Sequence, residues 1–85
     1  MNEEKKIVAF LNTHKEAEQT RQVLEHLFFR GAITDMVARD RYGISRLAAV
    51  IWKLRHIYGF QIDSYTEKRP NRWGKPVAYS VYSLA

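Results

Sequence analysis

The apolar residues of this 85-residue chain recur first at helical spacing and later at strand spacing. Over residues 14–30, apolar side chains return every three or four positions. Thr13 and Glu16 form a capping-box pattern at the start of this run, and Arg30-Gly31 suits its end, because glycine readily takes the left-handed conformation. These signals predict a helix over residues 14–30.

Two further helices are predicted on either side of a glycine. Thr34 can cap a short helix over residues 35–41, which ends at Tyr42-Gly43. A longer helix follows over residues 44–58, where Ser45 or its neighbour can cap. Its apolar side is expected to consist of Ile44, Leu47, Ala48, Ile51, Leu54 and Tyr58. Its outer side is expected to consist of Ser45, Arg46, Ala49, Trp52, Lys53 and His56.

The remaining pattern predicts a β-hairpin. Residues 60–66 and 77–84 are rich in β-branched and aromatic side chains, as strands are. Residues 67–76 form the expected loop, with two prolines, one glycine and four positive charges. The predicted domain, residues 13–85, is therefore mainly α with a small β-hairpin (α+β), namely three helices and a two-stranded C-terminal hairpin. Residues 1–12 are expected to form an N-terminal arm or a short helix.

The charge of the chain is concentrated in its second half. The net charge is +5, from 14 Lys and Arg against 9 Asp and Glu. Residues 1–40 hold six basic and seven acidic residues, whereas residues 41–85 hold eight basic and two acidic ones. The basic residues of this half fall in two clusters, one over residues 41–55, most of it on the third predicted helix, and one over residues 68–75 on the hairpin loop. Two basic clusters on one small domain indicate a nucleic-acid partner.

Several function classes lack support in the sequence. The chain has no cysteine, which excludes a disulfide framework or thiolate chemistry and suits a reducing cytoplasm. His14, His26 and His56 are too widely separated for a metal-ligand pattern. No glycine-rich phosphate loop, catalytic motif or membrane-spanning run of about 18 apolar residues is present. We therefore expect a cytoplasmic protein that is not an enzyme, needs no cofactor or metal, and has no membrane or small-molecule partner.

A short helix, a glycine turn and a longer helix describe a helix-turn-helix, and the hairpin makes it a winged helix. An α-helix with its side chains is about 10–12 Å wide and fits a major groove of about 12 Å. The third helix, residues 44–58, is therefore the expected reading element.

Four segments resemble the winged helix-turn-helix family common in tailed phages and prophages. They are residues 31–34, 42–55, 59–62 and 82–84, which match the patterns G-x-(I/L)-T, (Y/F)-G-I-x-R-L-A-A-x-I-x-x-L-R, G-x-x-I and Y-x-L. The resemblance covers roughly residues 20–84. It implies a DNA-binding fold in a phage or mobile-element setting. The chain departs from the family at residues 37–39, where Val-Ala-Arg stands in place of the usual Glu-Ala-Leu.

The candidate contacts with double-stranded DNA lie on the third helix and the wing. Arg46 is expected to bond guanine acceptors and Ser45 to reach a base edge, while Lys53 and the wing neutralise phosphates. Alternatives remain: Arg46 pairing with Asp35 or Asp40, and Trp52 shielding the core edge. Arg55 is expected to pair with an acid or with carbonyls in a structural role. The predicted DNA-binding set is Arg41, Ser45, Arg46, Ala49, Trp52, Lys53, Lys68, Arg69, Arg72, Trp73 and Lys75.

The predicted hairpin is apolar or aromatic on both faces. One face packs on the helices, so the other is expected to meet the N-terminal segment or a second subunit. The candidates for self-association are Tyr65, Val77, Tyr79 and Val81, and a homodimer would let two reading helices contact a palindrome. The preferred function is a transcriptional regulator. The alternatives are a protein-interaction adaptor that uses this hairpin face and an architectural, excisionase-like DNA binder.

Overall fold

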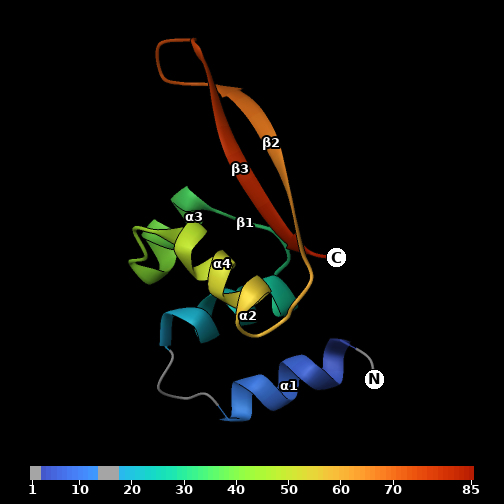
Figure 1. Cartoon of the computed structure of the whole chain (residues 1–85). Coiled ribbons are helices and arrows are strands. Elements are labelled where there is room, and N and C mark those ends of the chain that lie inside the picture. The colour runs from blue at the N-terminus through green and yellow to red at the C-terminus, as the bar shows by residue number, and fades with distance from the viewer. Residues whose placement is uncertain (1–2, 14–17) are drawn as a thin grey trace.

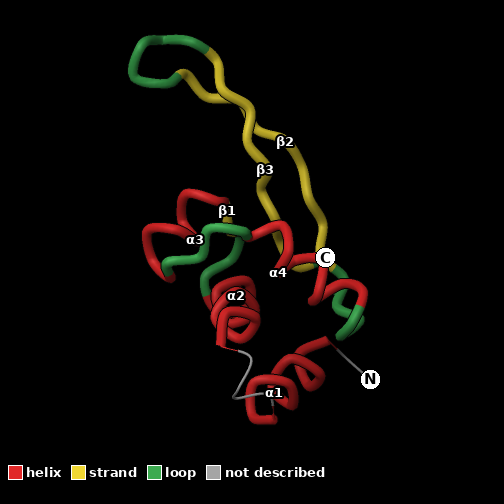
Figure 2. Tube along the Cα trace, turned by 60° about the vertical axis from the view of Figure 1, so that its left-hand side comes forward, coloured by secondary structure: helices red, strands yellow, loops and turns green. Residues whose placement is uncertain are grey.

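A computed structural model describes residues 3–13 and 18–85, as four helices and three strands (Figure 1). In chain order these are α1 (Glu3–Thr13), α2 (Glu18–Phe29), β1 (Ile33–Thr34), α3 (Asp35–Tyr42), α4 (Leu47–His56), β2 (Ile62–Pro70) and β3 (Pro76–Leu84). The helices form one body, and the β2–β3 hairpin projects from it (Figures 1 and 2). The whole measures 45 × 24 × 21 Å along its principal axes. The predicted α+β winged-helix fold is confirmed.

The sheet has one strand more than the sequence predicted. Its order is β1-β3-β2, and all pairings are antiparallel. Ile33 and Thr34 of β1 pair with Tyr82 and Val81 of β3. A two-residue strand is too short to show an alternating pattern, so only its tertiary pairing reveals it.

The strands β2 and β3 are longer than predicted, so the loop between them shrinks to residues 71–75. Pro70 and Pro76 face each other as the last pair of the ladder. The next hydrogen bond toward the tip runs from the Asn71 N–H to Lys75 O, at 2.8 Å. Pro70 and Pro76 therefore stand at a pair of the ladder that needs no N–H from either residue. The two prolines, which suggested a loop, are therefore the strand residues next to the tip, and they do not interrupt the pairing of β2 and β3.

Two helix boundaries also differ from the prediction. Thr13 is the last residue of α1, and its hydroxyl donates to Ala9 O at 2.6 Å. The other residues of the predicted capping box lie within 14–17, outside the described residues, and α2 is described from Glu18. The third predicted helix is shorter, because α4 begins at Leu47 and ends at His56.

The core lies between α1, α2, α4 and the base of the sheet. Its fully buried members include Ile7, Leu24, Ile33, Leu47, Ile51 and Leu54. Ala48, which was expected to face inward, is exposed, and Val50 is buried in its place. The buried positions 47, 50, 51 and 54 follow the spacing of a single apolar stripe, from which Ala48 is rotated away. Arg55 has the predicted structural role, because its Nε donates to Ile62 O at 3.0 Å.

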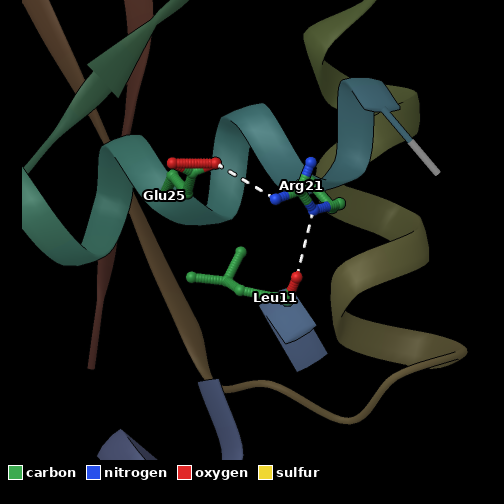
Figure 3. A network of polar contacts seen from close by, with 3 residues as sticks. All are labelled: Leu11, Arg21 and Glu25. Atoms are coloured by element: carbon green, nitrogen blue, oxygen red, sulfur yellow. Dashed lines mark hydrogen bonds and ion pairs between the residues drawn. The ribbon is translucent and has the colours of Figure 1, made fainter. Parts of the chain in front are cut away.

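The helix α1 closes the end of the helical body opposite the wing (Figures 1 and 2). Phe10 packs edge-on against Tyr58 and Phe60, with ring centroids 4.7 and 5.6 Å away. Lys6 Nζ donates to Gly59 O at 2.6 Å. On the α2 side, Arg21 Nε donates to Leu11 O at 3.3 Å and its guanidinium lies 3.8 Å from Glu25 (Figure 3).

His26 of α2 is a buried polar link to the helix-turn-helix. Its Nε2 donates to Ala32 O at 3.1 Å, so its Nδ1 accepts from the Tyr42 hydroxyl at 2.8 Å when the ring is neutral. Burial lowers the pKa of His26 below its usual value; the bond to Ala32 opposes this shift, and the charges of Arg41 and Arg30 add to it. The native state therefore favours the neutral ring.

The free energy of unfolding is expected to fall as pH drops below about 6.5, the ordinary pKa of histidine. The unfolded state then takes up a proton before folded His26 does, so stability is fully present above that pH and is lost toward the lower folded-state pKa. Urea unfolding at pH 7.5 and 5.5 measures the loss, and His26→Gln should shrink it. The matched control is His56→Gln, at an exposed histidine of α4, which should keep it. An equal pH dependence in the wild type and His26→Gln would refute the assignment.

Candidate nucleic-acid interface

The helix-turn-helix is built from α3, a four-residue turn and α4. Thr34 caps α3 as predicted, with its Oγ1 accepting from Val37 N at 3.3 Å, although the usual glutamate is absent. Gly43 ends α3 in the left-handed conformation, at φ 67°, which glycine adopts without strain. Ile44 N donates to Ala38 O at 3.1 Å. At the position where the family pattern has leucine, Arg39 points to solvent, and Ala38 takes the buried position beside it.

The outer side of α4 carries the predicted reading residues. Arg46 is the N-cap residue, and no side chain caps the helix, contrary to the expectation for Ser45 or its neighbour. The Ala49 N–H donates to Arg46 O at 3.2 Å, so only the amides of Leu47 and Ala48 are left for an external acceptor. The buried side faces the core, and the exposed side presents Ser45, Arg46, Ala49, Trp52 and Lys53.

The alternatives raised for Arg46 and Trp52 find no support in the structure. Within residues 3–13 and 18–85, Arg46 forms no ion pair with Asp35 or Asp40. Trp52 is 55% exposed, so it does not shield the core edge. Its ring lies tilted on His56 at 5.0 Å between centroids, one turn further along α4.

The wing carries the second cluster of cations. Lys68 and Arg69 lie on β2, opposite Ala78 and Val77 of β3. Because they are consecutive residues of a strand, their side chains project from opposite faces of the hairpin. Arg69 lies 3.9 Å from Glu67. The other exposed cations of the predicted set form no ion pair within the described residues; they are Arg41, Arg46, Lys53, Lys68, Arg72 and Lys75.

The tip of the wing is an ordered turn centred on Asn71, a residue that the sequence analysis did not single out. Its side-chain Oδ1 accepts from Trp73 N at 2.9 Å and from Lys75 N at 3.0 Å. Its main-chain oxygen accepts from Gly74 N at 2.9 Å, and Gly74 has a φ of 80°. The Asn-x-x-Gly spacing is the signal that would have predicted this turn. Arg72 lies over the Trp73 ring, 5.5 Å from its centroid.

The proposed self-association face is only partly available. Tyr65 and Val77 are 54% and 46% exposed, but Val81 is 3% exposed, because Tyr65 and Thr34 flank it on the two neighbouring strands. Tyr79 is half-buried and its hydroxyl donates to Glu67 Oε2 at 3.0 Å. Loss of contact with water raises the pKa of Tyr79, and this bond raises it further. Val81 therefore offers little surface for the self-association that the sequence analysis expected of it. Helix α1 lies at the end of the molecule opposite the hairpin, so it does not cover this face (Figure 2).

The described residues contain no metal site and no membrane-spanning helix. No group of three or more His, Asp or Glu side chains gathers in this part of the chain as metal ligation would need. No helix among the same residues has the length and apolar character to cross a bilayer.

Comparison with known proteins identifies the family. Searches of curated proteins and of solved structures find no match. A family model described as a winged helix-turn-helix domain matches residues 18–85, from the start of α2 to the end of the chain. Domains of this kind typically bind DNA and are not enzymes. With the α3–Gly43–α4 turn and the wing in the positions that define it, the chain belongs to the winged helix-turn-helix domain family.

Proposed function

We propose that this protein is a transcriptional regulator of phage or mobile-element type, which binds double-stranded DNA through α4 and the wing. The observation that carries the proposal is a set of exposed cations on these two elements with no acidic partner in the described chain. Cations without internal partners are free to neutralise phosphates, and the release of counterions then drives binding.

In this proposal the exposed side of α4 enters the major groove. Arg46 stands at the N-terminal end of the helix, where residues of such motifs reach base edges. Its guanidinium can bond both acceptors of a guanine, and Ser45 lies beside it. Ala49, one turn further, is small enough to permit close approach or to touch a thymine methyl group. Lys53 and Arg41 are assigned to phosphates.

The wing has a sequence-independent role in this proposal. Lys68, Arg72 and Lys75 are exposed around the tip, where they can reach phosphates or the minor groove, whose narrow segments favour arginine.

The main test of the proposed function is selection of bound duplexes from a random library, followed by anisotropy at two salt concentrations. An enriched motif with salt-sensitive binding supports the proposal. Absence of salt-sensitive binding at micromolar protein would refute it.

Arg46→Ala is expected to weaken binding to the selected site by about 1–3 kcal/mol and to relax specificity at one base pair. The cost is the loss of a bidentate contact, so affinity for unrelated duplexes should change less. The matched control is Arg39→Ala, which removes an exposed arginine from α3 outside the predicted set. Anisotropy on the selected site and its single-base variants measures both effects. Unchanged specificity in Arg46→Ala would show that another face of the protein reads the DNA.

A second candidate function is a protein-interaction adaptor that uses the outer hairpin face. The observation that favours it is the exposure of Tyr65 and Val77, which lie on the outer face of the hairpin that also carries the wing cations. The same face could join two copies into a dimer on a palindromic site. Light scattering with and without DNA, together with Tyr65→Ser, distinguishes these outcomes. If Tyr65→Ser is monomeric and binds DNA with the affinity of the wild type, this face has no role in self-association on DNA.

A further inference from the structure

The wing tip carries a large aromatic side chain that the fold does not use. Trp73 is 75% exposed, more than any other large apolar side chain in the described residues. It lies eleven residues beyond Ile62, the buried residue of β2, in the turn that joins β2 to β3 at the tip of the hairpin. Exposure of an indole in water is unfavourable, so its place at the tip is better explained by a ligand than by folding.

The backbone that holds Trp73 is fixed before any ligand arrives. Asn71 Oδ1 bonds the amide of Trp73 itself, and the Asn71–Lys75 pair closes the turn. Pro70 and Pro76 stiffen the two ends of the turn. Little backbone entropy is therefore lost when the tip is inserted into a partner.

The surroundings of Trp73 select a polyanion. The Arg72 guanidinium lies 5.5 Å over the ring, and Lys75 follows two residues later. Lys68 and Arg69 stand on the adjoining end of β2. An indole that stacks with Arg72 on a cationic tip suits nucleobases between phosphates better than an apolar protein surface or a lipid tail.

The length of the wing suits a second groove of the same duplex. Val81 is the residue nearest the tip at which β3 still pairs with β1. From Val81 toward the tip, β3 continues for five residues to Pro76. This distance is about 17 Å at about 3.4 Å per residue. Half a turn of B-DNA also rises about 17 Å. A duplex held at α4 by its major groove therefore has a minor groove within reach of the tip.

We propose that Trp73 is a wedge that enters the minor groove, partly unstacks one base step and bends the bound DNA. This inference rests on the proposed binding of duplex DNA. Apolar side chains inserted from the minor groove kink DNA in this way, at the flexible steps that unstack most easily. Arg72 and Lys75 then neutralise the phosphates on either side of the opened step. The protein thereby shapes DNA in addition to reading it.

The bend is measured by energy transfer between dyes at the two ends of a selected duplex of about 30 base pairs. The wild type should bend the DNA by about 20–90°, and Trp73→Ala should lose most of that bend while still binding. Trp73→Phe should keep part of it. The matched control is Phe29→Ala, which removes an exposed aromatic side chain of α2 outside the predicted DNA-binding set and should leave the bend in place. An equal bend in the wild type and Trp73→Ala would overturn the proposal.

A second measurement reports stacking directly. In Trp52→Phe, Trp73 is the only tryptophan of the chain. Its fluorescence should be strongly quenched by duplex DNA and protected from iodide, since the indole then stacks on bases. Anisotropy of a labelled duplex in the same titration separates the two hypotheses. Binding without quenching or bending overturns the wedge alone, whereas absence of binding by the wild type as well overturns the proposed function and the wedge with it.

Discussion

Replacing Phe10 with alanine is expected to lower the free energy of unfolding by about 3–5 kcal/mol. Phe10 is 6% exposed, and its ring packs edge-on against both Tyr58 and Phe60. Truncation would leave a cavity between α1 and the turn that follows α4. Because small domains are stable by only about 5–15 kcal/mol, this loss is a large fraction of the total.

The expectation matters because α1 lies outside the segment that matches the family, residues 18–85. Its contacts nevertheless make it part of the same core. Ile7 is 1% exposed, and Lys6 and Leu11 bond to Gly59 and Arg21. Helix α1 therefore supports α2 and the turn that follows α4, on the side opposite the wing.

Urea unfolding followed by circular dichroism measures the effect. The matched control is Val8→Ala on the same helix, where the side chain is 45% exposed. This control removes apolar surface without opening a cavity and should cost far less. Equal losses in the two variants would contradict the packing of α1 described above.

Replacing Lys68, Arg72 and Lys75 together with glutamine is expected to weaken binding to any duplex by several hundredfold at about 0.1 M salt. Each phosphate contact contributes about 0.9 to the slope of log K against log salt, so the slope should fall by about 2.7. At about 0.1 M salt this corresponds to about 3–4 kcal/mol of binding free energy. Arg69 is left in place because it pairs with Glu67.

Anisotropy with a random duplex over a range of salt concentrations measures the slope. The control is Arg30→Gln, at an exposed arginine after α2 that lies outside the proposed interface. It lowers the net charge of the protein without touching the wing, so the slope should stay the same. If the triple variant kept the wild-type slope, the wing would not be in contact with phosphates.

Local signals were enough to predict the helix-turn-helix. The cap at Thr34 and the left-handed Gly43 act within a few residues, and both form as predicted. The helical spacing of Leu47, Ile51 and Leu54 likewise placed the inner side of α4, which left its cations on the outer side. All eleven predicted DNA contacts lie at exposed positions, on α3, α4 and their turn and on the wing.

Features that depend on distant partners could not be predicted in this way. Val81 alternates like an exposed strand residue, yet the pairing of β1 and β2 on either side of it leaves it buried. Ala48 and Val50 flank the stripe of Leu47, Ile51 and Leu54 on opposite sides, and the neighbouring elements cover Val50 rather than Ala48. The ordered tip depends on Asn71 bonding across a turn whose ends are set by strand register.

The sequence by itself determined the α+β class, the order of helices and hairpin, and the concentration of charge on α4 and the wing. These follow from periodicity, caps and composition, which act over short stretches of chain. Only the tertiary structure decided that α1 completes the core, that a two-residue strand joins the sheet, and that Trp73 stands on a fixed, exposed turn. Those outcomes depend on which surfaces meet in space, because burial and strand pairing are set by residues far apart in the chain.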